Sequence, residues 1–190
     1  MLARSGARCC RCSRRLTASE STVAPIAAHE WIRLPDRQLT VIVDLAWRCL
    51  DDWDDERWDW NRVVYAHRHP EISEILYIGK ADCMTVRERF VAPDRRKLLR
   101  RLRAAFSIPD SPLSIGFVYG LQRSTGWETP AHECVTEGLI TDVESLLINQ
   151  LQPYGNKQCR EFRRPRPGLV VRCVGAWSGP NEFWDVPSRL

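Results

Sequence analysis

Apolar positions along the chain change their spacing from one segment to the next, which separates predicted strands from predicted helices. Short β-rich apolar runs that are bounded by polar or turn-forming residues are typical of strands. They lie at residues 39–46, 62–66, 74–79, 113–120 and 169–176. The second and third runs flank a polar segment with Pro70, which predicts a hairpin with a long loop. His67 and His69 fall in this predicted loop, so we expect them at the surface.

Three segments have helical spacing instead. Thr85 and Glu88 match the capping box, in which a hydroxyl at the helix start is followed three residues later by a carboxylate. Residues 94–105 carry leucines at helical spacing, and a further helix is expected from about residue 136 to residue 151. The pattern predicts a mixed α/β fold of the α+β type.

The polar face of the 94–105 helix is strongly basic. Between Arg87 and Arg103, eight basic residues meet two acidic ones, Glu88 and Asp94. Such a charge run is either a solvated face or a surface that contacts phosphates. We favour the second interpretation and expect nucleic acid to contact six of the side chains. They are Arg89, Arg95, Arg96, Lys97, Arg100 and Arg103.

Glu144 lies in the middle of an apolar stripe on the 136–151 helix. At 100° per residue, Ile140, Leu147 and Ile148 all lie within about 60° of it around the helix. A buried carboxylate without a partner costs several kcal/mol, on the order of 3 or more. Glu144 therefore needs a partner, which is either a structural arginine or the metal or substrate of an active site.

Composition and charge narrow the class of protein. The chain has 190 residues with 44% hydrophobic and 27% charged residues, which is typical of one globular domain. Its apolar runs are too short to span a membrane. Twenty-five of the 28 basic residues are arginines, which suits phosphate binding, although codon bias would produce the same excess. Scattered cysteines and the lack of an apolar signal core favour a reducing, cytoplasmic location.

Charge is unevenly distributed along the chain. Residues 51–60 hold six acidic residues and Arg57 among three tryptophans, although the whole chain carries a net charge of +4. We expect the tryptophans to cover part of the core while the carboxylates stay solvated. A segment that mimics nucleic-acid charge is the alternative. Residues 1–28 read as a disordered basic arm, a targeting segment or an over-long gene start.

Two tyrosine motifs relate these features to a known family. Val63-Val-Tyr65 precedes Tyr77-Ile-Gly79, with Tyr77 twelve positions after Tyr65; Arg87 follows Gly79 by eight positions, and Asn156 follows Glu144 by twelve. Over residues 62–156 the chain closely resembles the GIY-YIG nuclease superfamily. The first motif departs from the family because Val63 stands where the family has glycine.

The resemblance implies a fold and a reaction. The family's fold is a small three-stranded antiparallel sheet flanked by helices, and its reaction is hydrolysis of a phosphodiester with one divalent metal. Glu144 would be the metal's sole protein ligand, for Mg2+ or Mn2+. Tyr65 would take a proton from the attacking water, and Tyr77 would orient the phosphate or the water.

The remaining site residues implied by the resemblance are cationic or polar. Arg87 would offset the charge that develops on the phosphorus, helped by free N–H groups of a helix N-terminus. Lys80 would help to lower the pKa of Tyr65. Asn156 would hold the geometry of the metal site or touch the backbone.

The sequence thus predicts a metal-dependent DNA endonuclease in residues 61–157. An N-terminal extension at 29–60, with the acidic tryptophan-rich segment, and a basic C-terminal extension at 158–190 would flank it. The alternatives are a nucleic-acid-binding module of the same fold with weakened catalysis, and a zinc-dependent adaptor that uses the cysteines. Cutting both DNA strands with one site per chain would favour a homodimer.

Overall fold

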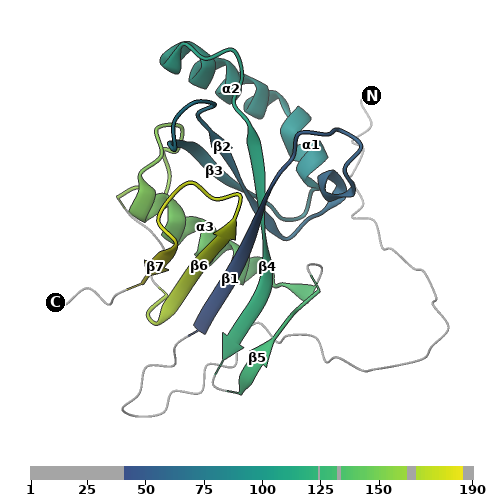
Figure 1. Cartoon of the computed structure of the whole chain (residues 1–190), viewed down its shortest axis with the longest axis vertical. Coiled ribbons are helices and arrows are strands. Elements are labelled where there is room, and N and C mark those ends of the chain that lie inside the picture. The colour runs from purple at the N-terminus through teal and green to yellow at the C-terminus, as the bar shows by residue number, and fades with distance from the viewer. Residues whose placement is uncertain (1–40, 124, 132–133, 162–165, 186–190) are drawn as a thin grey trace, which may run out of the picture.

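The computed structural model describes residues 41–123, 125–131, 134–161 and 166–185. One sheet runs through the molecule (Figure 1), in the order β3-β2-β4-β1-β6-β7, with β5 added beside β4. Its strands are β1 (Val41–Cys49), β2 (Val63–Arg68), β3 (Ile75–Ala81), β4 (Leu113–Arg123), β5 (Gly126–Glu128), β6 (Leu169–Gly175) and β7 (Glu182–Trp184). The basic arm predicted at residues 1–28 lies outside the described residues.

The predicted three-stranded sheet is too small. Strands β2, β3 and β4 pair antiparallel, as expected. However, β1 continues the sheet antiparallel to β4, β6 runs parallel to β1, and β7 closes the far edge. The segments predicted as extensions therefore supply strands to the same sheet. Their apolar runs were recognisable as strands, but the pairing of residues more than a hundred positions apart leaves no local signal.

Three α-helices are present in the described part of the chain, and they cover two faces. They are α1 (Val86–Val91), α2 (Pro93–Phe106) and α3 (Glu137–Leu151), preceded by a short 3-10 helix, η1 (Glu56–Asp59). α3 packs through Ile140, Val143 and Leu147 on one face, behind β1 and β6 in Figure 1. α2 packs through Leu98 and Leu102 on the opposite face of the β2–β3 end.

Local signals at the helix ends match the structure. Thr85 caps α1 in a complete capping box with Glu88, so this prediction is confirmed. Thr136 caps α3, with its side chain accepting a hydrogen bond from the N–H of Leu139. None of the helices described is both long enough and apolar enough to cross a bilayer.

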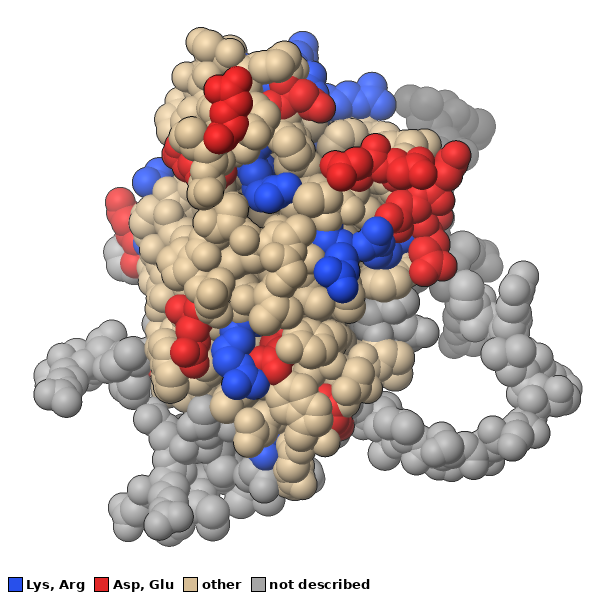
Figure 2. Space-filling model, in the orientation of Figure 1, with Lys and Arg blue, Asp and Glu red and all other residues tan. Residues whose placement is uncertain are grey.

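Two sequence expectations were wrong in part. His67 belongs to β2 rather than to a surface loop, and 0% of it is exposed. In the acidic segment Trp58 is buried in the core, whereas Trp53 is 46% exposed. Figure 2 shows carboxylates gathered on the side of the molecule beside α1.

Candidate functional site

The two tyrosines of the sequence motifs lie side by side at the β2–β3 end of the sheet. Tyr65 pairs across the strands with Gly79, and the ring centroids of Tyr65 and Tyr77 are 6.2 Å apart. A Cβ atom on Gly79 would lie 2.6 Å from the hydroxyl oxygen of Tyr65 and 2.8 Å from the ring of Tyr77. Glycine at position 79 is therefore what allows the two phenol rings to approach each other.

The side chain of Asn156 forms hydrogen bonds with the backbone of β3 at the free edge of the sheet. Its side-chain oxygen accepts a hydrogen bond from the N–H of Ile78 at 2.9 Å, and its amide nitrogen donates to the carbonyl of Ile78 at 2.8 Å. The N–H of Gly155 donates to the carbonyl of Leu76 at 2.7 Å. These bonds give hydrogen-bond partners to the edge strand β3. They fix Leu76 and Ile78, the two residues that flank Tyr77. Asn156 thus acts on the site through the strand that carries Tyr77.

Arg95 does not lie on the solvent-facing surface where the sequence placed it. It begins the buried stripe of α2 and is only 8% exposed. Its guanidinium carbon lies 4.5 Å from the ring centroid of Tyr77 and 5.6 Å from that of Tyr65. Within the described chain it makes no ion pair with a carboxylate. A buried guanidinium in this setting is available to an anion from outside the protein.

Glu144 is electrostatically coupled to the same cluster. Burial raises the pKa of Glu144 to about 7, and the cations Lys80, Arg95 and Arg89 oppose that rise. Lys80 donates hydrogen bonds to Asp82 at 2.8 Å and to Thr141 of α3 at 2.6 Å. Lys80 therefore links β3 to the helix that carries Glu144. The sequence left the partner of Glu144 open, and no described arginine forms an ion pair with it.

Burial also raises the pKa of both phenols. The pKa of Tyr65 is raised far above its usual value by desolvation and by Tyr77, while Arg95 and Arg89 lower it. The pKa of Tyr77 is raised mainly by desolvation and is likewise lowered by Arg95 and Arg89. Both tyrosines are therefore neutral hydroxyl groups at pH 7 unless additional positive charge arrives.

Arg87 contacts the acidic segment at residues 51–60 rather than the two tyrosines. Its guanidinium donates to the carboxylate of Asp59 at 2.9 Å and to the carbonyl of Trp53 at 3.1 Å, and it lies 4.8 Å from the ring centroid of Trp53. These partners belong to the acidic segment. Arg89, two residues on in α1, influences the pKa values of Tyr65, Tyr77 and Glu144 instead. The cations at the tyrosines are thus Arg89 and Arg95.

The other basic residues predicted to contact nucleic acid are distributed as follows. Arg96, Lys97 and Arg100 are exposed on α2. Arg103 is exposed but forms an ion pair with Asp110 at 2.6 Å, and Arg89 forms one with Asp94 at 3.2 Å. The solvent-facing side of α2 therefore keeps most of its positive charge available.

Sequence reasoning missed His67 as a site residue. It lies on β2 two residues after Tyr65, and its ring centroid is 6.2 Å from those of both tyrosines. Burial lowers the pKa of His67 to about 4, so the ring is neutral at pH 7. Its position two residues from Tyr65, on the same face of a strand, was the signal that could have found it.

Three polar atoms in this cluster are buried without a regular hydrogen bond in the described structure. They are the hydroxyl oxygen of Tyr65, Nε2 of His67 and Nε of Arg95. Buried polar groups are nearly always satisfied in folded proteins, and exceptions concentrate at functional sites. The cluster of Tyr65, Tyr77, His67, Arg89, Arg95, Lys80 and Glu144, which we call the tyrosine cluster, is therefore the candidate active site.

The donor set of the tyrosine cluster fits a hard divalent cation. The Glu144 carboxylate, whose ionised form is disfavoured by burial, is a suitable oxygen ligand for Mg2+ or Mn2+. A second group, Asp82, Cys83 and Glu137, brings its ligand atoms within 4.8 Å of one another. Asp82 in that group is already ion-paired with Lys80, so we assign no metal to it.

The cluster can bind an anion, supply hydroxyl donors to it and offer one carboxylate to a metal. Comparison with known proteins adds nothing to this list: no family model, no curated protein and no solved structure matches the chain.

Proposed function

We propose that the protein is a metal-dependent endonuclease that hydrolyses phosphodiester bonds in DNA. The observation that carries the proposal is that two phenols meet the guanidinium of Arg95 at the β2–β3 end of the sheet. The carboxyl group of Glu144, whose pKa is raised, is electrostatically coupled to Arg95, Arg89 and Tyr77. The basic face of α2 supports DNA as the substrate, because its arginines complement a polyanion.

Several residues of the tyrosine cluster would have separate tasks in this reaction. Glu144 would hold Mg2+ or Mn2+, which supplies Lewis-acid chemistry when bound. Arg95 and Arg89 would offset the negative charge on the phosphate, the interaction that dominates phosphoryl chemistry. Tyr77, neutral and next to Arg95, would donate a hydrogen bond to a phosphate oxygen.

Tyr65 has a more restricted role than the resemblance implied. As a neutral, buried phenol it is a hydrogen-bond donor at pH 7 and accepts a proton from water only if its pKa falls. Arg89 and Arg95 both lower that pKa, and the negative charge of a phosphate would partly cancel their effect. Lys80 would keep Glu144 in place through Thr141, and Asn156 would keep Tyr77 in place through β3.

The second candidate function is a nucleic-acid-binding module of the same fold with weakened catalysis. The raised pKa of Tyr65 favours it, because a phenol that stays protonated is a poor base. Val63, in place of the family's first glycine, is consistent with the same interpretation.

The test compares two glutamates of α3. Glu144→Ala should abolish nicking of supercoiled plasmid in Mg2+ or Mn2+ while leaving DNA binding nearly unchanged. Glu137→Ala, an exposed residue of the first turn of the same helix, should nick like the parent. Equal nicking by Glu144→Ala and the parent would reject the assigned site. A parent protein that binds DNA without cutting it would favour the second candidate.

A further inference from the structure

Helix α2 carries Arg95 of the tyrosine cluster in its first turn and ends at Phe106, which belongs to a second cluster of aromatic rings. Arg95 and Phe106 are eleven residues apart, which places them within about 20° of each other around the helix and about 16 Å apart along it. Phe106 packs edge-on against Tyr154 with ring centroids 5.2 Å apart, and against His69 at 6.2 Å. These three rings, which we call the aromatic rim, lie around Phe106 at the C-terminal end of α2, whereas Arg95 lies in its first turn.

Tyr154 presents an open ring on a rigid support. It is 55% exposed, although aromatic side chains usually bury most of their surface. Its neighbours Gly155 and Asn156 are hydrogen-bonded to Leu76 and Ile78 of β3. A Cβ on Gly155 would lie 3.2 Å from Cβ of Tyr77. The segment that carries Tyr154 thus packs directly behind Tyr77.

The positive charges of α2 favour binding of a polyanion along the helix, between Arg95 and Phe106. Arg103 and Arg96 lie within about 80° of Phe106 around the helix, beside the line that joins Arg95 to Phe106. The loop between β2 and β3, which supplies His69 to the aromatic rim, also carries the exposed carboxylates Glu71 and Glu74. Phosphates are therefore attracted to the α2 side and repelled from the loop side.

We propose that the aromatic rim stacks an unpaired nucleobase, so that the substrate is DNA with a single-stranded segment next to the cut. An exposed aromatic ring beside a basic track binds single strands because every base offers a π face, whereas the bases of a duplex are stacked on one another. The rise of about 16 Å along α2 from Arg95 to Phe106 corresponds to about five nucleotides of a stacked strand at about 3.4 Å each. The inference rests on the proposed function, since it assumes that the cut phosphate lies at Arg95.

The experiment measures binding and cleavage of two DNA molecules by the full-length protein. One is a fully paired duplex, and the other is the same duplex with a single-stranded flap. Tyr154→Ala should weaken binding of the flap about tenfold, the value of one lost base stack, and leave binding of the duplex unchanged. Tyr154→Phe, which keeps the ring, should bind like the parent.

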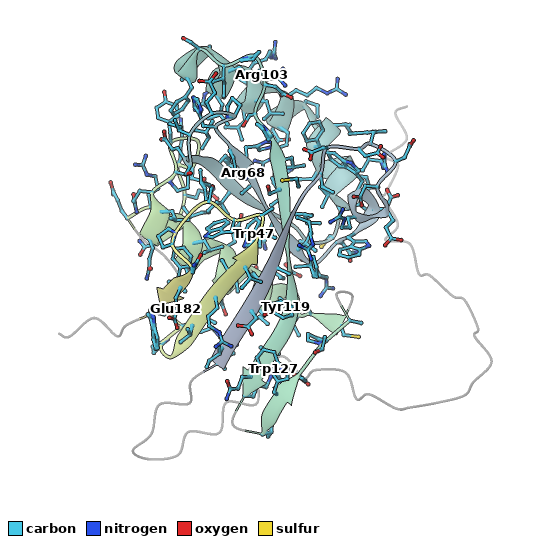
Figure 3. All side chains as sticks on the ribbon, in the orientation of Figure 1. Trp47, Arg68, Arg103, Tyr119, Trp127 and Glu182 are labelled. Atoms are coloured by element: carbon cyan, nitrogen blue, oxygen red, sulfur yellow. The ribbon has the colours of Figure 1, made fainter. Side chains whose placement is uncertain are left out.

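Trp127→Ala is the matched control for loss of an exposed ring. Trp127 is 50% exposed and lies on β5, at the opposite end of the molecule from Arg103 of α2 (Figure 3). Its loss should not change the preference for the flap. Equal affinity of the parent and Tyr154→Ala for the flap would overturn the inference.

The outcomes separate this inference from the proposed function. If the parent cuts both substrates at equal rates and Tyr154→Ala changes nothing, the aromatic rim has no role although the nuclease remains. If the parent binds the flap through Tyr154 and never cuts it, the base-stacking surface is supported and the nuclease is rejected. Thermal unfolding of each variant checks that the fold is intact.

Discussion

The two ends of the sheet treat their buried charged groups in different ways. At the β1–β6 end Asp44 is only 4% exposed and accepts two hydrogen bonds from Arg172, at 2.6 and 2.9 Å. Asp142 is likewise paired with Arg166. At the β2–β3 end the buried guanidinium of Arg95 forms no ion pair with a carboxylate in the described structure. The hydroxyl oxygen of Tyr65, Nε2 of His67 and Nε of Arg95 have no hydrogen-bond partner there.

The difference indicates which end is built for stability and which for binding. A buried polar group without a partner costs about 1–3 kcal/mol, whereas a paired one costs little or stabilises. A fold that pairs its buried charges at one end and leaves the buried guanidinium of Arg95 without a carboxylate at the other retains the second arrangement for a different reason. Interaction with a substrate is that reason in our proposal.

The largest expected effect comes from Arg95. Arg95→Met should lower DNA cleavage about a hundredfold, because one preorganised cation at the phosphate is lost. The free energy of unfolding should stay constant or rise, since a buried charge without a carboxylate is removed. Single-turnover cleavage and urea unfolding measure the two quantities.

Two neighbouring arginines are the controls for Arg95. Arg96→Met, on the exposed side of α2, and Arg87→Met, which loses its contacts with Asp59 and Trp53, should each lower cleavage less than about tenfold. A larger loss for Arg87→Met than for Arg95→Met would return the catalytic role to Arg87.

The β1–β6 end should respond in the opposite way. Asp44→Ala should lower the free energy of unfolding by about 2–3 kcal/mol, because it removes a buried carboxylate and the two hydrogen bonds that Arg172 donates to it. It should leave cleavage per folded molecule unchanged. Asp110→Ala, which breaks the exposed pair with Arg103, should cost less than about 1 kcal/mol. Urea unfolding at pH 7 provides both values. Equal losses of stability in Asp44→Ala and Asp110→Ala would mean that the burial of Asp44 adds nothing to the free energy of unfolding.

The smallest expected effect is the pH dependence at His67. The pKa of this ring is lowered to about 4, whereas an exposed histidine has about 6.5, so the unfolded chain binds more protons between these values. Stability should therefore fall as the pH drops from 7 to 5, by about 2 kcal/mol from His67 alone.

His67→Phe should remove that part of the pH dependence. The parent and the variant are compared by urea unfolding at pH 7, where both side chains are neutral, and at pH 5. If both lose the same stability between the two values, His67 is not held neutral by the fold.

Local features of the site were predictable from the sequence, and the identity of its cations was not. The strands that carry Tyr65 and Tyr77, the cap at Thr85 and the helix around Glu144 all follow from short-range patterns. Arg95 was assigned to the exposed face with the other arginines of α2. Its spacing of four from Leu99 and seven from Leu102 already indicated the buried stripe.

The error at His67 has a related cause. Its polar neighbours and Pro70 predicted a loop, but β2 continues to Arg68 because its backbone pairs with β3 on one side and β4 on the other. Strand length here depends on available partners rather than on the composition of the segment. The same reasoning applies to β5, a three-residue strand that pairs with β4.

The sequence by itself determined the elements that short-range periodicity and capping encode, and the residue types on which the tyrosine cluster depends. The tertiary structure alone decided that Asp44 meets Arg172 across 128 positions, that β1, β6 and β7 enlarge the sheet, and that Arg95 rather than Arg87 contacts the two phenols. The physical reason is that hydrophobic periodicity records which face of an element is buried, whereas the partner of that face is selected by packing across the whole chain.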